Sequence, residues 1–306
     1  MSFLPKVEVQ PSVREQWELG PTISRHNLAD CPLFDDGAII ELLDRTPKQN
    51  LFALHMGADP ELHGENRLAV HDGLSGEALL RAVQRGRLWL NVTRIDLFAH
   101  QYSEVIGSLY EQLRQQIPSF NPQVTTITLL VSSPDALVYY HVDGPASLLW
   151  HIRGEKHLWV YPREERFVSQ PNLEEIFAGA AHEYLPYKHD FDTAASHYVL
   201  TPGTLASWAP NSPHRVTNGS SFCVSLSTEH FTPEHRRKAR VYNANRLLRR
   251  TLGFRHLSTR ASGVPSLAKQ AVFALAARAG LGRTTGKRHI PALRVDPEAP
   301  DGVRPL

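Results

Sequence analysis

The chain has 306 residues, 42% of them hydrophobic and 21% charged, which is typical of a globular protein with a buried core and excludes a disordered or fibrous chain. Its two cysteines, Cys31 and Cys223, indicate neither a disulfide framework nor a cysteine zinc site, and they favour a reducing compartment. The net charge of +2 conceals an asymmetry, because 17 Lys/Arg stand against 27 Asp/Glu up to Phe231 and 16 stand against 4 beyond it.

Residues 1–120 mix helical and strand patterns. Asp35 and Ser75 are helix-capping residues placed before segments of helical periodicity, and residues 103–118 form a further amphipathic segment closed by a proline. Two apolar runs read as strands: residues 51–57 and 88–95. We therefore predict an α+β N-terminal elaboration packed on the rest of the chain.

Residues 121–231 change to short β-rich runs separated by turn residues. Runs at this spacing predict a sandwich or barrel of antiparallel strands, so we expect a mostly β core with added helices. Within it, "SLLWHIRGEKHLWVYP" reads as a hairpin folding back at Gly154. A long insertion over residues 163–196 carries one predicted helix, and insertions of this kind are often lids or binding loops.

Residues 232–306 hold most of the basic excess. Thr232 as a cap and Pro233 at the first helical position predict one helix, a second is predicted from Pro265 to Ala279, and the residues from Arg283 onward are expected to be loosely ordered. Two interpretations of this region stay open. The basic tail contacts an anionic surface such as nucleic acid or lipid, or the helices pack within the protein or form a homodimer.

A candidate metal site lies in "YYHVDG" and "PNSPHRV". His141 and Asp143 are two residues apart, which places both side chains on one face of a strand, and His214 follows a proline-containing turn later in the chain. Two imidazoles and one carboxylate leave other metal positions open, as in the facial site of non-haem Fe(II) oxygenases. A hydrogen-bonded His–Asp pair without metal is the structural alternative.

Lys156 is the fourth candidate. It shares a strand face with Leu158 and Val160, and a lysine on an apolar face needs an anionic partner if it is buried. The alternative is a lysine at the mouth of the hairpin that reaches water. His151 and His157, nearby, are interpreted as surface or satisfied core residues and not as metal ligands.

The segments "HVDGPASLLWHIRGEK" and "PNSPHRV" resemble the Jumonji-C and cupin-like Fe(II)- and 2-oxoglutarate-dependent oxygenases, including their bacterial members. The layout is most similar to that of the asparaginyl hydroxylase that inhibits hypoxia-inducible factor. The resemblance implies a double-stranded β-helix, or jelly roll, over residues 121–231. It also implies that His141, Asp143 and His214 hold Fe(II) and that Lys156 binds the distal carboxylate of 2-oxoglutarate.

The chain departs from the family pattern at two positions. Val138 stands where a hydroxyl residue is frequent, and Ser147 stands where an asparagine is frequent. A second co-substrate contact must then come from elsewhere. The sequence offers these candidates: Tyr139, Thr128, Ser147 and Ser225. Tyr139 is favoured among them because regular strand alternation would place it on the same face as His141 and Asp143.

The first functional hypothesis is a 2-oxoglutarate-dependent dioxygenase that uses O2 and hydroxylates a substrate C–H bond. The substrate class stays open among a protein side chain, a small molecule, and an anionic glycolipid or nucleic acid. The second hypothesis is a cupin-fold regulatory or binding protein without turnover, in which the site senses metal or 2-oxoglutarate and the basic tail binds nucleic acid.

No apolar run at the start resembles a signal peptide, and the most apolar C-terminal run is too short to span a bilayer. We therefore expect a cytoplasmic protein, with peripheral membrane contact as an open alternative.

Overall fold

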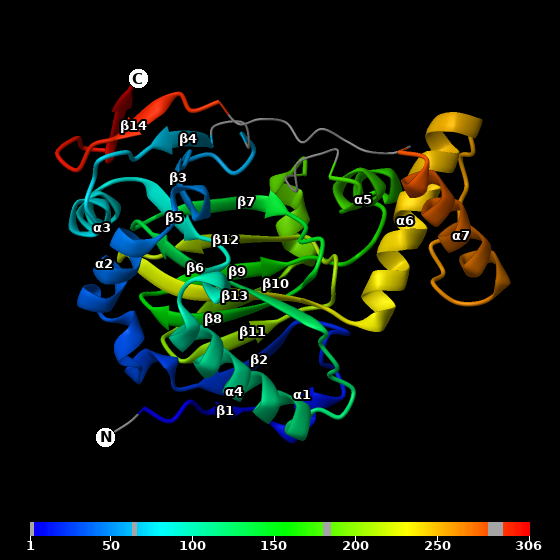
Figure 1. The fold of residues 1–306 in the computed structure, drawn as a ribbon, viewed down its shortest axis with the longest axis horizontal. Coiled ribbons are helices and arrows are strands. Elements are labelled where there is room, and N and C mark those ends of the chain that lie inside the picture. The colour runs from blue at the N-terminus through cyan, green and yellow to red at the C-terminus, as the bar shows by residue number, and fades with distance from the viewer. Residues whose placement is uncertain (1–2, 63–65, 180–184, 281–289) are drawn as a thin grey trace.

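The fold is that of a computed structural model, which describes residues 3–62, 66–179, 185–280 and 290–306 (Figure 1). Within these ranges, fifteen strands form two sheets. The larger sheet has the spatial order β1 (Val7–Glu8), β2 (Thr22–His26), β11 (Thr204–Ser207), β8 (Ala146–Arg153), β13 (Cys223–Phe231), β6 (Val124–Ser132), β5 (Leu88–Val92), β3 (Leu51–His55), β4 (Arg67–Val70), β14 (Leu293–Val295), β15 (Val303–Pro305). The smaller sheet has the order β10 (Ser196–Leu200), β9 (Lys156–Val160), β12 (His214–Asn218), β7 (Leu137–His141).

The strands β6 to β13 form a jelly roll. β6, β8, β11 and β13 are neighbours in the larger sheet, and β7, β9, β10 and β12 make up the smaller one, so the chain passes repeatedly from one sheet to the other. Apolar side chains from both sheets, among them Leu149, Leu158 and Val216, form one cluster between them. The predicted double-stranded β-helix core with added helices is confirmed.

The predicted hairpin around Gly154 is wrong. β8 pairs with β11 and β13 in the larger sheet, whereas β9 pairs with β10 and β12 in the smaller one. The turn between them is therefore a corner at which the chain crosses to the opposite sheet. Gly154 has φ +83°, and a Cβ added there would lie 2.6 Å from Cys223 Sγ and from the Phe222 carbonyl oxygen. The corner requires glycine, which sequence alone reads equally well as a hairpin turn.

Gly154→Ala is expected to lower the free energy of unfolding by about 2 kcal/mol or more, because left-handed strain adds to a clash with backbone atoms. Gly107→Ala is the matched control. Gly107 lies within a helix, nothing lies within 4 Å of a Cβ added there, and helix propensity predicts a gain of about 0.5–1 kcal/mol. Urea unfolding of both variants tests this. Equal stability of Gly154→Ala and the parent protein would contradict it.

The larger sheet extends beyond the jelly roll on both sides. β1 and β2 continue it next to β11, and β5, β3 and β4 continue it next to β6. At the far edge β14 pairs in parallel with β4, and Leu293 and Val295 are buried there. The expectation of a loosely ordered end is thus wrong for residues 290–306, while residues 283–289 lie outside the described ranges. The short β14 and β15 carry too few residues to show strand alternation.

The helices lie around the sheets: α1 (Pro11–Arg14), α2 (Asp36–Arg45), α3 (Gly76–Arg85), α4 (His100–Gln116), α5 (Gln170–Phe177), α6 (Pro233–Leu252) and α7 (Val264–Arg278). The predicted caps are confirmed, since the side chains of Asp35, Ser75 and Thr232 accept hydrogen bonds from the first turns of α2, α3 and α6. α4 packs its buried face on the core of the larger sheet, and α7 lies farthest from the sandwich (Figure 1). None of the helices within the described ranges combines the length and apolar character that a bilayer-crossing segment requires.

Candidate metal and co-substrate site

The fold brings His141, Asp143 and His214 together at one end of the jelly roll. β7 ends at His141, β12 begins at His214, and the two residues are paired in the ladder. Their Nε2 atoms each lie 3.5 Å from one carboxylate oxygen of Asp143, and one ligand atom from each of the three residues lies within 4.8 Å of the others. The arrangement predicted from two distant motifs is therefore present in space.

Both imidazoles are oriented for metal binding. His141 Nδ1 lies 2.7 Å from the Tyr139 carbonyl oxygen and His214 Nδ1 lies 3.1 Å from that of Ser212. A carbonyl oxygen only accepts, so each Nδ1 carries a proton, and Nε2 is the nitrogen that each imidazole can offer to a metal beside Asp143. Burial lowers the pKa of His214 to about 4, which keeps that imidazole neutral near neutral pH.

A β-bulge precedes the metal site. His214 pairs with His141 and Val216 pairs with Val138, so three residue steps on β7 match two steps on β12. Val138 belongs to the cluster between the sheets, and the bulge interrupts the regular alternation on which the choice of Tyr139 depended. Tyr139 is fully buried. Sequence gives little sign of such a bulge, because no glycine or proline marks it.

Asn211 fixes the turn that carries Asp143. Its Nδ2 donates to the carbonyl oxygens of Asp143 at 3.0 Å and Gly144 at 3.3 Å. Asn211 itself has φ +64°, a left-handed conformation that asparagine tolerates better than most residues. It thus positions the carboxylate without contacting the metal position.

Asn211→Gly is expected to weaken metal binding about tenfold, because glycine keeps the left-handed backbone but loses both amide hydrogen bonds. Titration with Co(II) or Fe(II), followed by absorbance, measures this change. Asn27→Gly is the control. Asn27 lies in the turn before residues 28–30, and its replacement is expected to leave the metal affinity unchanged. An unaltered affinity in Asn211→Gly would show that the turn holds Asp143 without the amide.

Lys156 lies in the interior, 3% exposed. Its Nζ donates to Asn218 Oδ1 at 2.7 Å and to Ser132 Oγ at 3.2 Å, and burial lowers its pKa. Asn218 is held in turn by donating to the Ser132 hydroxyl and the Ser133 carbonyl. Among the described residues no carboxylate lies within ion-pair distance of the ammonium, so the buried cation has only neutral partners.

The metal end and the lysine end share one ladder. Val160 pairs with His214 and Lys156 pairs with Asn218, so the two rows are four residues apart along β9 and β12, or about 13 Å. The sequence missed Ser132 and Asn218, although Asn218 lies four residues after His214 and so on the same strand face.

The other predicted co-substrate residues surround this interior. Ser225 is fully buried and its hydroxyl contacts His151 Nδ1 at 3.0 Å, while His151 Nε2 donates to the Gly154 carbonyl. His151 is thus a satisfied core histidine, as predicted. Thr128 is partly exposed and pairs with Ser227. Among the described residues, Lys156 donates its hydrogen bonds to Ser132 and Asn218 and to neither Ser225 nor Thr128, so the co-substrate roles of these two residues stay predictions.

Ser147 lies nearer the metal end. It is 3% exposed, its hydroxyl has no hydrogen-bond partner among the described residues, and it pairs with Glu229 across the β8–β13 ladder. Burial, together with the negative charge of Asp143, raises the pKa of Glu229 to about 7. Glu229 was not anticipated from the sequence, which offers no signal for it beyond strand alternation.

The fold and this cluster define a double-stranded β-helix protein with an open two-histidine, one-carboxylate site. Among solved structures, the chain is similar to YcfD of Escherichia coli, with 16% identity over 89% of this chain and 68% of that one and a TM-score of 0.51. A second YcfD structure is described as that of a ribosomal oxygenase in complex with cobalt and 2-oxoglutarate. It shows 15% identity over 89% of this chain and 67% of that one, with a TM-score of 0.50. No protein-family model and no curated protein sequence matches the chain. At this identity the similarity establishes the fold.

Proposed function

We propose that the protein is an Fe(II)- and 2-oxoglutarate-dependent oxygenase that hydroxylates a substrate C–H bond. The observation that carries the proposal is the pairing of a metal-ligand cluster with a buried lysine that has only neutral partners, on one ladder. A buried cation without a counter-ion is costly unless an anion binds to it. The YcfD structure with cobalt and 2-oxoglutarate has the same fold and supports this choice of co-substrate.

The donor set fits Fe(II). Two neutral imidazoles and one carboxylate form the facial set that iron oxygenases use, and the second nitrogen of each imidazole is hydrogen-bonded to backbone. When bound, Fe(II) with 2-oxoglutarate and O2 supplies the oxidising chemistry, in which 2-oxoglutarate leaves as succinate and CO2.

The chain's own residues bind and orient. His141, His214 and Asp143 would hold the metal, and the single carboxylate partly neutralises its charge. The Lys156 ammonium would hold the distal carboxylate of 2-oxoglutarate, with Asn218 and Ser132 fixing its direction. No protein group needs to act as acid or base, because the metal and co-substrate perform the oxidation.

Anaerobic addition of Fe(II) and 2-oxoglutarate tests the proposal. We expect a visible metal-to-ligand charge-transfer band in the parent protein and none in His141→Ala. His157→Ala is the matched control, since His157 is half-buried on β9 and contacts His197 instead of the metal cluster. A parent protein without the band, or an undiminished band in His141→Ala, would refute the proposed site.

Admission of O2 separates an enzyme from a sensor. An oxygenase releases succinate from the anaerobic complex, and release should increase when the correct substrate is present. A regulatory protein that only binds metal and 2-oxoglutarate shows the band and forms no succinate. The intact set of three ligands and a lysine favours the enzyme, because a sensor without turnover does not need an open position for O2.

A further inference from the structure

Helix α7 exposes a stripe of apolar side chains to solvent. Val264, Leu267 and Leu275 lie along one stripe, at helical spacing of three and eight residues, and are 78%, 66% and 65% exposed. On the opposite side, buried Ser266 accepts a hydrogen bond from Gln270 within α7. A surface helix of a globular protein normally buries its large apolar side chains. The apolar stripe therefore has no partner in the described part of the chain.

Two further exposed apolar side chains lie shortly before α7 in the sequence. Leu252, at the end of α6, is 66% exposed, and Phe254, just beyond the Gly253 cap, is 49% exposed. α7 packs against α6 and lies on the outer side of it, away from the sandwich (Figure 1). With Val272, which is 37% exposed, residues 252–275 thus present six large apolar side chains to solvent.

The same region is strongly cationic. Residues 235–295 contain no aspartate or glutamate, and residues 235–280 alone contain 11 Lys/Arg. Exposed cations include Arg255, Arg260 and Arg278. In the described structure none of these three lies within ion-pair distance of a carboxylate. Any surface that covers the apolar stripe must therefore accept a dense positive charge.

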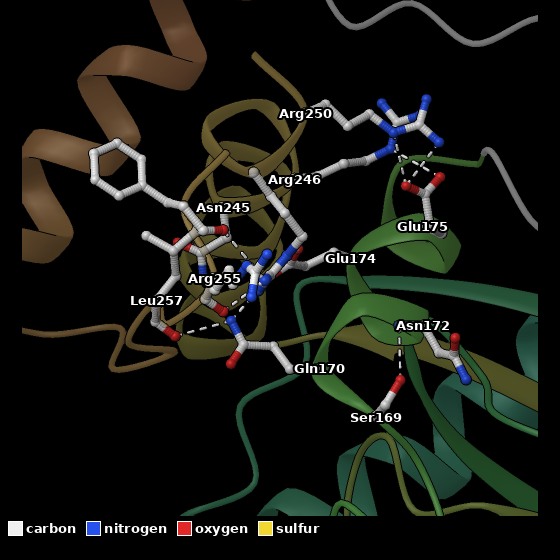
Figure 2. Close-up of polar contacts among 12 residues, drawn as sticks. Ser169, Gln170, Asn172, Glu174, Glu175, Asn245, Arg246, Arg250, Arg255 and Leu257 are labelled. Carbon is white, nitrogen blue, oxygen red and sulfur yellow. Dashed lines mark hydrogen bonds and ion pairs between the residues drawn. The ribbon is translucent and has the colours of Figure 1, made fainter. Parts of the chain in front are cut away.

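Three of the arginines have a different role, because they tie α6 to α5. Arg246 and Arg250 both pair with Glu175, at 3.0 and 2.9 Å, as Figure 2 shows. Arg249 pairs with Glu174, which is only 1% exposed. These ion pairs, of which those of Arg246 and Arg249 are largely buried, fix the direction of α6 against α5.

We propose that the α6–α7 surface docks on an anionic lipid surface. Val264, Leu267 and Leu275 insert between lipid headgroups, and the surrounding arginines bind the phosphates, which is the composition of interfacial helices. A symmetric contact between two copies would bring the two cationic regions together and is disfavoured by repulsion. Nucleic acid offers phosphates but no apolar layer for the stripe. Charge and apolar exposure together therefore favour lipid.

Cosedimentation of the full chain with phosphatidylcholine vesicles, with and without phosphatidylglycerol, tests the proposal. We expect retention only when phosphatidylglycerol is present, and weaker retention at higher salt. Leu267→Glu/Leu275→Glu is expected to lower the partition coefficient by about tenfold or more. Arg255→Ala/Arg260→Ala is expected to lower it about fivefold for each charge removed. Both pairs of side chains are exposed, so the fold should tolerate the changes, which circular dichroism checks.

Leu97→Glu is the matched control. Leu97 is 60% exposed and lies outside α6 and α7, so this variant should bind vesicles like the parent protein. Unchanged binding of Leu267→Glu/Leu275→Glu would overturn the proposal. So would a dimer, detected by light scattering without vesicles, that this double variant dissociates. Retention on duplex DNA in place of vesicles would also overturn it. Each readout is independent of metal and 2-oxoglutarate, so oxygenase activity does not affect the result.

Discussion

Asp143→Ala is expected to weaken Fe(II) binding by more than about a hundredfold and to abolish 2-oxoglutarate turnover, because removal of a direct ligand exceeds the loss seen for residues that only orient ligands. Asp143 is the one carboxylate between the two imidazoles, each with Nε2 at 3.5 Å from it. Without it, two neutral imidazoles remain, and they do not neutralise a divalent cation. Isothermal titration with Co(II), followed by Fe(II) under anaerobic conditions, measures the affinity.

The stability of the metal-free protein should change little in Asp143→Ala. The carboxylate is partly exposed, and the turn around it is also held by Asn211 through backbone carbonyls that alanine retains. Asp190→Ala is the matched control, since Asp190 is an exposed aspartate paired with Arg166. If Asp143→Ala retained iron affinity, a metal role for this cluster would be excluded. If it unfolded the protein, the carboxylate would be structural.

Lys156→Met is expected to lower the affinity for 2-oxoglutarate by about a hundredfold or more, since breaking a buried charge pair costs about 3–5 kcal/mol. The same variant should leave the co-substrate-free protein equally stable or more stable. Methionine has a similar length and is apolar, and the parent ammonium is 3% exposed with only hydroxyl and amide partners. A lysine that served the fold would show the opposite change in stability.

Thermal unfolding with and without 2-oxoglutarate, together with succinate formation across co-substrate concentrations, measures both effects. Asn218→Asp is an informative companion, because it places a carboxylate beside Lys156 that competes with the co-substrate. Lys48→Met, at an exposed lysine paired with Asp72, is the matched control. A Lys156→Met protein that loses stability but retains co-substrate affinity would contradict the assigned role.

The sequence predicted most of the jelly roll and the metal cluster. The β-rich runs, the capped helices and the His141, Asp143 and His214 motifs depend on local patterns, which a single sequence displays directly. The hairpin at Gly154 was wrong because a glycine turn has the same sequence signature whether the next strand pairs with the previous one or crosses to the opposite sheet. Pairing is a property of the whole topology.

The contacts of Lys156 were harder to predict. Ser132 lies on β6 and Asn218 on β12, in different sheets, and they meet at the lysine only because the two sheets face each other. The bulge at Val138–His141 likewise has no marker in composition. For these reasons the sequence identified the charged residues of the site but missed the neutral ones that orient them.

The shared β9–β12 ladder fixes the distance between the metal ligands and Lys156. Val160–His214 and Lys156–Asn218 are rungs of one rigid pair of strands, so the separation of the metal from the ammonium is fixed by strand rise and not by a movable loop. Leu158 and Val216 belong to the apolar cluster between these rungs. Under the proposed function, the length of dicarboxylate that reaches from the metal ligands to the lysine is therefore set by the sheet itself, and co-substrate analogues one carbon shorter or longer are expected to bind more weakly.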